Sequence, residues 1–383
     1  MKDHAEWRML KQLCVMPLAR SSDTWMEEWL SPLNSRLADS TALVNLAVRH
    51  KLTGALAVVT EHPHAKATFA PHIRDLLRTY RNANRVRNRV LTAEAIQIVD
   101  RLHALGVPVT ATKGVVLHHL VYRGDGSRRL SDIDFMIHPD NRQEVSAELR
   151  KLGLAFGTYD RAAHRIEPLG RKDELLYRVY PDHLPHALKL RDDPLVPFVM
   201  VDCAFSLTWF QAPWQIDMQH ALENPMRVEL NDNFASARMP QECITSLSAP
   251  FLWLFTVLHL FRESWIARDA MQGAATLAQY RDVVQLWRAL TSESRAAVRL
   301  AISNNRTIFP VTWVCEHADR ILGTTLCAEL NLGKPMPEEL LNTGLGPRET
   351  ILNWHGTMEQ RLSSEQPPEF FASANIRLED LGW

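Results

Sequence analysis

The chain has 383 residues, 46% of them hydrophobic, which predicts two or three domains with a large buried core. Its formal net charge at pH 7 is -1, which argues against a long nucleic acid as partner, because a nucleic-acid track makes a domain strongly basic. The five cysteines form no Cys-x-x-Cys pair, which argues against a disulfide framework and a structural zinc site and favours the cytoplasm.

Residues 1–103 predict an N-terminal helical region, and its charged beginning lacks the apolar stretch of a signal peptide. Within it, arginines recur at spacings of three and four residues, so they share one helix face. These are Arg74, Arg78, Arg81, Arg85 and Arg89. The face is either a solvated basic surface or a positive wall beside a phosphate site, and both interpretations stay open.

The pattern changes after this region. The β-branched run at 107–114 predicts a strand, and the apolar spacing at 115–122 predicts a short helix. A glycine-rich polar loop follows at 123–129. Residues 130–139 then alternate between apolar and polar, which predicts a strand with one packed face.

An amphipathic helix is predicted at 140–154, and the runs 186–191 and 196–205 predict two paired strands. Residues 155–185 show no clear pattern. Residues 104–210 therefore predict a small α+β core.

Residues 211–383 predict a C-terminal helical domain. Its most apolar run, residues 250–261, is shorter than the ~20 residues that span a bilayer, so it predicts a buried core helix.

The polar face of the strand at 130–139 carries Asp132 and Asp134, whose side chains are expected to lie about 5–7 Å apart. Two carboxylates this close repel each other unless a cation lies between them. Mg²⁺ takes oxygen ligands and commonly uses carboxylates together with substrate phosphates. Asp202, in the apolar run 198–205, is the expected third carboxylate, and three would hold two Mg²⁺ ions for an in-line phosphoryl displacement.

Lys113 and Gly114 end one predicted strand and open the next helix. A glycine there lets the backbone approach a ligand, and helix N-terminal N–H groups favour phosphate. Arg128 and Arg129 stand just before the second strand, where they either reach a polyphosphate or belong to a solvated loop. Ser131, directly before the first aspartate, joins the expected nucleotide-binding set.

The stretch from Ala111 to Leu154 resembles the bacterial family of uncharacterised nucleotidyltransferases, within the DNA polymerase β-like superfamily. The family pattern is a strand, Leu-Lys-Gly, a helix with Tyr, an Arg, Asp-Ile-Asp, and a helix ending in Leu-Gly. The matching positions are Lys113, Gly114, Tyr122, Arg128, Asp132, Asp134 and Gly153. The resemblance covers roughly residues 40–290. It implies a small mixed β-sheet nucleotidyltransferase core, flanked by helical regions, that uses Mg²⁺ and an NTP.

One segment departs from the family pattern. The family has Asp or Glu, then Leu, His and Trp on the strand of the third carboxylate, whereas Asp202 is followed here by Cys, Ala and Phe. The acid is kept, but the neighbouring contacts of the family are not.

The leading hypothesis is a nucleotidyltransferase that moves an NMP from an NTP, ATP favoured, to an unknown acceptor, with a small molecule or peptide preferred. Asp132, Asp134 and Asp202 would be catalytic and metal-binding. A catalytically degenerate nucleotide- or peptide-binding partner protein is the alternative. A DxD glycosyltransferase is disfavoured, because mostly helical residues stand where a nucleotide-sugar domain would precede the acidic pair.

Four further residues are weaker candidates for the cleft. These are His118, His259, Arg281 and Asp282. Each has an equally simple structural interpretation, as a buried or surface side chain of a helix.

Overall fold

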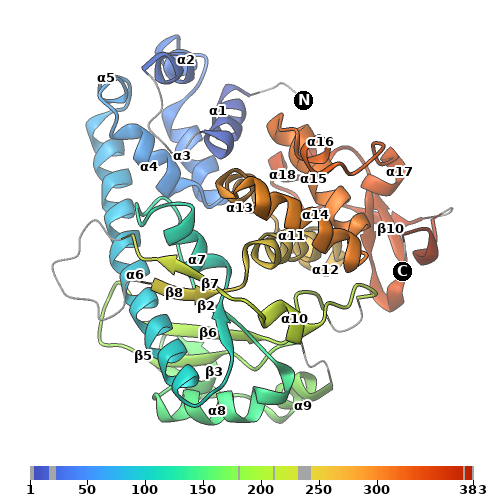
Figure 1. Ribbon diagram of the computed structural model, residues 1–383. Helices are drawn as coiled ribbons and strands as arrows, with labels where there is room; N and C mark the ends of the chain where they lie inside the picture. Colours follow the sequence, from blue (N-terminus) through green and yellow to red (C-terminus); the bar gives the residue numbers. More distant parts are fainter. Residues whose placement is uncertain are drawn as a thin grey trace. The chain divides into compact units, whose positions relative to one another are not determined.

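The computed structural model describes residues 4–16, 23–179, 182–209, 212–231, 243–373 and 376–381. The chain divides into two compact units (Figure 1). The helical unit comprises Met1–Arg78, Ala212–Trp214 and Trp253–Trp383, and the sheet unit comprises Thr79–Gln211 and Gln215–Leu252.

The sheet unit contains a mixed sheet whose described strands follow the order β4-β3-β5-β6-β2-β1-β8-β7. The strands are β1 (Val109–Ala111), β2 (Ile133–Ile137), β3 (Ala155–Asp160), β4 (Arg165–Pro168), β5 (Ala187–Leu190), β6 (Phe198–Ala204), β7 (Met226–Glu229) and β8 (Cys243–Ser246). The β2–β6 and β1–β8 pairs are parallel, and the other pairs are antiparallel. The predicted α+β class with a mixed sheet is confirmed.

Helices accompany this sheet. They are α6 (Pro71–Ala104), α7 (Lys113–Leu120), α8 (Arg142–Lys151), α9 (Arg171–Val179) and α10 (Met218–Leu222), with a 3-10 turn, η1 (Pro139–Asn141), before α8. The predicted order of strand, short helix, loop, strand and amphipathic helix is therefore observed. Residues 155–179, which lack a readable pattern, form β3, β4 and α9.

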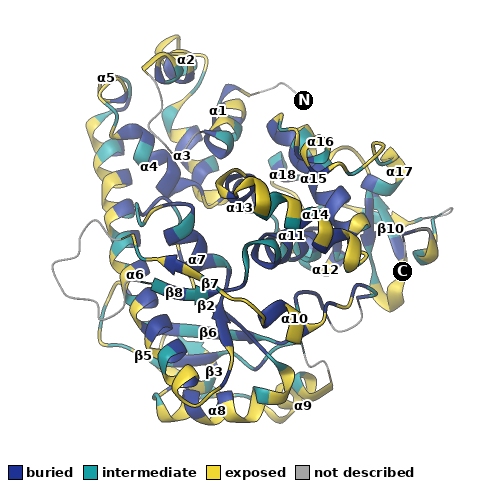
Figure 2. Cartoon of the chain, in the orientation of Figure 1, coloured by how far each residue is buried: buried dark blue, intermediate teal, exposed yellow. Residues whose placement is uncertain are grey.

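The prediction of one packed face on the second strand is wrong. All five residues of β2 are buried (Figure 2), because β2 lies between β1 and β6 in the middle of the sheet. A central strand is covered on both faces, so its polar residues are buried as well. Asp132 also falls outside the strand, since β2 begins at Ile133.

The two units do not follow the expected boundaries. The expected core ended at residue 210, but β7 and β8 lie beyond it and extend the same sheet. The expected helical region ended at residue 103, yet α6 is one continuous helix from Pro71 to Ala104, and Thr79 onwards belongs to the sheet unit. The physical reason is that each unit gathers the segments that pack together, whatever their order in the chain.

The helical unit is formed by helices from both ends of the chain. They are α1 (Ala5–Val15), α2 (Asp23–Asn34), α3 (Ser40–Arg49), α4 (Thr53–Thr60), α5 (Ala65–Thr68), α11 (Ala249–Trp265), α12 (Ala267–Met271), α13 (Leu277–Ala289), α14 (Ser292–Asn304), α15 (Ile308–Leu322), α16 (Leu326–Leu330), α17 (Glu338–Leu341) and α18 (Met358–Ser363). A small sheet with the order β11-β10-β9 joins them: β9 (Thr343–Leu345), β10 (Ile351–Trp354) and β11 (Phe370–Ala372).

The core of the helical unit is rich in aromatic side chains. Trp253, Trp265, Trp287 and Trp313 are all almost fully buried. The apolar run at 250–261 lies in α11, as predicted. Among the described residues, every helix is too short or too polar to cross a bilayer.

Candidate active site

The three predicted carboxylates gather where the beginning of β2 pairs with the second half of β6. These strands are parallel neighbours, and their register places Asp134 opposite Asp202. Neighbouring strands are about 4.8 Å apart and aligned residues point to the same face, so these two side chains stand side by side. Asp132 immediately precedes β2, two residues before Asp134. The sheet therefore brings together acids from three separate positions of the chain.

Lys113 lies against this acidic group. Its Nζ is 2.8 Å from Asp134 Oδ1. Burial lowers the pKa of Lys113, but the charges of Asp134, Asp202 and Asp132 outweigh burial, and the pKa is raised. The backbone of Lys113 has a φ of 42°, a left-handed conformation that is strained for a residue with a side chain. Such strain at the junction of β1 and α7 is typical of functional positions.

The acids themselves repel one another. Burial, and then the negative charge of Asp134, raises the pKa of Asp132 to about 6, although the Ser131 hydroxyl donates a 2.9 Å hydrogen bond that works in the opposite direction. Asp202 Oδ1 is buried and has no hydrogen-bond partner. Clustered carboxylate oxygens with an unused buried acceptor fit a hard divalent cation such as Mg²⁺.

Two histidines lie beside Asp202, and neither was predicted from the sequence. The ligand atoms of His183, His186 and Asp202 lie within 4.8 Å of one another. His183 Nδ1 is 3.4 Å from Asp202 Oδ1 and 2.8 Å from the carbonyl oxygen of Leu184. A carbonyl only accepts hydrogen bonds, so we assign the ring proton to Nδ1, which leaves the Nε2 lone pair free to accept a proton or bind a metal.

The position of His183 bears on the departure from the family pattern. Its backbone pairs with Ala204 in an antiparallel bridge, and Ala204 stands where the pattern has histidine. The imidazole beside Asp202 thus comes from the neighbouring segment. The spacing His-x-x-His before a strand was the available signal, but residues 155–185 gave no pattern in which to place it.

Gly114 and Arg128 meet at the beginning of α7. A Cβ on Gly114 would lie 3.2 Å from Arg128 Nη1 and 3.1 Å from Leu130 Cδ2. The glycine therefore makes room for the guanidinium at the helix N-terminus, close to Lys113. Ser131 and Arg129 are exposed beside them. Two cations and a helix N-terminus at one place suit a polyphosphate.

The glycine-rich loop at 123–129 is held against α6. Arg81 Nε and Arg85 Nε donate to the Asp125 carbonyl oxygen at 2.7 and 3.1 Å. Asn84 donates to the carbonyl of Gly126 at 3.2 Å. Gly126 has a φ of +78°, and a Cβ there would lie 2.9 Å from the Arg81 carbonyl oxygen, so only glycine fits. Arg81 and Arg85 therefore fix the loop. This part of the arginine face forms neither a solvated basic surface nor the wall of a phosphate site.

Asn88 continues the same contact one helical turn later. Its Nδ2 donates to the carbonyl of Arg128 at 2.8 Å, and its Oδ1 accepts from the N–H of Leu130 at 3.2 Å. Asn88 is fully buried. The side chains of α6 therefore position the backbone that carries Arg128 and leads to Asp132.

The remaining candidates are not brought to the acids by any described contact. His118 is buried on α7, where its Nδ1 lies 3.2 Å from Asn88 Nδ2 of α6, so its local role is packing against that helix. His259, Arg281 and Asp282 belong to the helical unit. His259 Nδ1 lies 3.7 Å from Glu263 Oε2, and the other two are buried. A place for these three in the cleft stays a prediction.

A cavity of about 620 Å³ opens beside His183 in the sheet unit. Three arginines line it, Arg142 and Arg150 from α8 and Arg178 from α9. Tyr177 also lines it, and burial, followed by the charge of Asp202, raises the pKa of its hydroxyl. The cavity therefore adjoins the acidic group, and its wall is rich in positive charge.

The family described as uncharacterised nucleotidyltransferase matches residues 37–306 of the chain. This match contains the β1–α7–β2 unit, β6, and every residue that the sequence predicts for the site. In a comparison with curated proteins, no match is found.

Proposed function

The chain belongs to the uncharacterised nucleotidyltransferase family, and we propose that it transfers an NMP group from an NTP, with ATP favoured, to an oxygen of an acceptor. Pyrophosphate is the second product. The observation that carries this proposal is the β2–β6 register, which sets Asp134 beside Asp202 with Asp132 two residues away. Three carboxylates on adjacent strands are the arrangement that two-metal phosphoryl transfer needs.

Asp132 and Asp134 would hold two Mg²⁺ ions, with Asp202 completing the site of one of them. When bound, these ions neutralise charge on the phosphates. Lys113, Arg128 and the backbone at Gly114 hold the triphosphate at the N-terminus of α7, with Ser131 and Arg129 at its edge. These cations and N–H groups stabilise the negative charge that develops on the leaving pyrophosphate.

Asp202 takes the proton of the acceptor hydroxyl or phosphate as its oxygen bonds to the α-phosphorus. His183, whose Nδ1 lies 3.4 Å from Asp202 Oδ1, offers Nε2 as a second proton acceptor. The bond that breaks joins the α-phosphorus to the bridging oxygen, and its electrons leave with pyrophosphate. The arginine-lined cavity beside His183 would hold the acceptor, and its charge favours an anionic small molecule or peptide.

The decisive experiment pairs binding with turnover. Nucleotide binding is measured by calorimetry with and without Mg²⁺, and pyrophosphate release is measured with candidate acceptors that carry phosphate or carboxylate groups. We expect Mg²⁺-dependent NTP binding that is lost in the Asp132→Ala, Asp134→Ala double variant, and pyrophosphate release with at least one acceptor.

The alternative functions give different results. Metal-independent nucleotide binding that survives in the double variant, with no pyrophosphate release, would identify a degenerate binding protein. Arg299→Ala is a suitable control, because Arg299 lies in the helical unit and donates to the Glu329 carbonyl oxygen. It should leave both measurements unchanged.

A further inference from the structure

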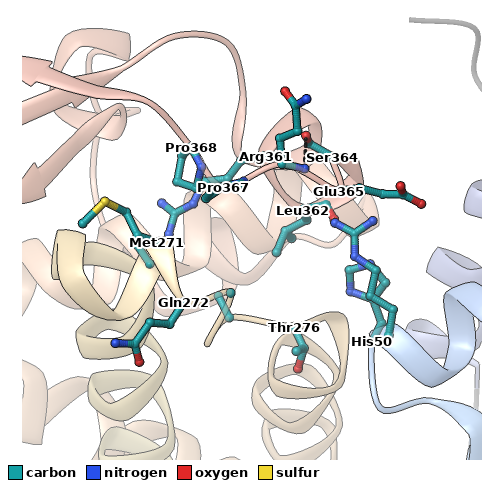
Figure 3. A pocket seen from close by; sticks show the side chains of 15 residues that line it. His50, Met271, Gln272, Thr276, Arg361, Leu362, Ser364, Glu365, Pro367 and Pro368 are labelled. Carbon is teal, nitrogen blue, oxygen red and sulfur yellow. Dashed lines mark hydrogen bonds between the residues drawn. The ribbon is translucent and has the colours of Figure 1, made fainter.

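A second cavity lies within the helical unit, and the proposed reaction does not use it. Its volume is about 310 Å³, which is in the range of small-molecule sites. It is bounded by the end of α3, the turn from α12 to α13, and the segment after α18. Figure 3 shows the lining side chains Met271, Gln272 and Thr276 from the turn, and Ser364, Glu365, Pro367 and Pro368 from the segment.

Arg361, on α18, brings a partly buried positive charge to this cavity. Its Nη2 donates to the Ser264 carbonyl oxygen at 2.7 Å, and its guanidinium lies 5.0 Å from the ring centre of Trp354. Its Nη1 is buried and has no hydrogen-bond partner. Burial lowers the pKa of Arg361 to about 10, so the group stays charged at neutral pH.

The charge of Arg361 is not balanced locally. Within the described ranges, no carboxylate lies within 4.0 Å of its guanidinium nitrogens. A buried donor atom of a cation that has no partner is costly unless an acceptor, and best of all an anion, completes its contacts. Arg361 Nη1 therefore marks a position for an oxygen atom.

His50 supplies a second unused donor from the end of α3. Its Nδ1 accepts a hydrogen bond from the N–H of Leu277 at 3.4 Å, so in the neutral ring the proton is on Nε2. Burial, and then the charge of Arg49, lowers the pKa of His50 to about 4, which keeps the ring neutral. The Nε2 atom is buried without a partner, and the residue is 2% exposed.

The rest of the wall also favours an anion. Helix α13 begins at Leu277, directly after the lining residue Thr276, and the N-terminus of a helix carries partial positive charge. Arg49 donates to the carbonyl oxygens of Leu362 and Ser363 and so fixes the end of α18 at the cavity. The negative charge of Glu365 opposes the positive charge around the cavity, but the Glu365 side chain is exposed to solvent.

We propose that this cavity binds a small molecule through an oxyanion group, either phosphate or carboxylate, whose oxygens accept hydrogen bonds from Arg361 Nη1 and His50 Nε2. The site lies entirely in the helical unit and uses none of the catalytic carboxylates. It therefore stands whether or not the proposed nucleotidyl transfer is correct.

The test is calorimetric titration of the full chain, without Mg²⁺, with inorganic phosphate and separately with succinate, against sodium chloride at equal ionic strength. We expect one of the two oxyanions to bind and chloride not to bind. Affinity should fall at least about tenfold in Arg361→Gln, because a charge-assisted hydrogen bond contributes at least that factor. Phosphate binding identifies a phosphorylated ligand, and succinate binding a carboxylated one.

Two further variants make the test decisive. Ala275→Leu fills the cavity without removing a charged group, since Ala275 lines it and is partly buried. It should abolish binding even if Arg361→Gln fails to fold. Arg299→Gln is the matched control, because this arginine also donates to a carbonyl oxygen in the same unit but does not line the cavity.

Binding that is lost in Ala275→Leu and kept in Arg299→Gln supports the proposal. The absence of phosphate and succinate binding at millimolar concentration overturns it. Binding that persists unchanged in Ala275→Leu, or disappears in the Asp132→Ala, Asp134→Ala variant instead, also overturns it, because the anion then binds elsewhere.

Discussion

Asn88 holds the backbone between the glycine-rich loop and β2, and its removal should weaken this connection measurably. The side chain makes contacts to the Arg128 carbonyl oxygen, the Leu130 N–H and the His118 ring. Each buried hydrogen bond contributes about 1 kcal/mol net, so Asn88→Ala should lower the free energy of unfolding by about 3 kcal/mol.

Asn84 provides the matched control on the same helix. It is as deeply buried, but it makes one hydrogen bond, to the Gly126 carbonyl oxygen, and its own Oδ1 has no partner. Asn84→Ala removes the same atoms and should lower the free energy of unfolding by about 1 kcal/mol. The expected difference between the two variants is therefore about 2 kcal/mol.

Urea unfolding followed by circular dichroism measures this difference, and amide hydrogen exchange locates it. Exchange at Leu130 should accelerate in Asn88→Ala but not in Asn84→Ala, because only the former loses the acceptor of that N–H. Equal destabilisation by the two substitutions, or unchanged protection at Leu130, would refute the argument that Asn88 positions this segment.

Three other predictions follow from the described contacts. Gly114→Ala should raise the KM for the NTP about tenfold with a smaller change in kcat, measured by pyrophosphate release, since its Cβ would press on Arg128 Nη1 at 3.2 Å. Asp202→Asn should keep nucleotide binding but lower kcat by about a thousandfold or more, and a near-normal rate would remove Asp202 from its role. Burial lowers the pKa of His317 to about 3 and that of His50 to about 4, below the unfolded value near 6.5. Protonation of these histidines therefore favours the unfolded state, and each histidine should lower the free energy of unfolding by about 2 kcal/mol as pH falls from 6.5 to 5. His317→Phe should roughly halve the combined loss, which urea titrations at both pH values measure.

Much of the candidate site could be proposed from the sequence because its signals are local. One short stretch contains the alternating strand pattern, the Lys113-Gly114 junction and the spacing of Asp132 and Asp134. Asp202 stood out separately, because it is a charged residue in an apolar run. Asp202 was expected as the third carboxylate, but the register that aligns it with Asp134 became visible only in the sheet.

The missed features depend on contacts between distant segments. β3 and β4 contain mostly exposed or half-exposed residues, so they lack the alternation that marks a buried strand. His183 reaches Asp202 only because its segment pairs with Ala204. The role of Arg81 and Arg85 could not be inferred from their helical spacing, because their acceptor lies in a loop far along the chain.

The parallel pairing of β2 with β6 has a consequence for folding. The chain between these strands forms η1, α8, β3, β4, α9 and β5, so their pairing is a non-local event. It also brings Asp202 close to Asp132 and Asp134, and the charge of Asp202 adds to the burial and the charge of Asp134 that raise the pKa of Asp132. The pairing of β2 with β6 is therefore opposed by charge repulsion at the candidate site. If the proposed transfer is correct, these acids exchange some stability for activity, and replacing one of them by its amide should raise the free energy of unfolding while lowering turnover.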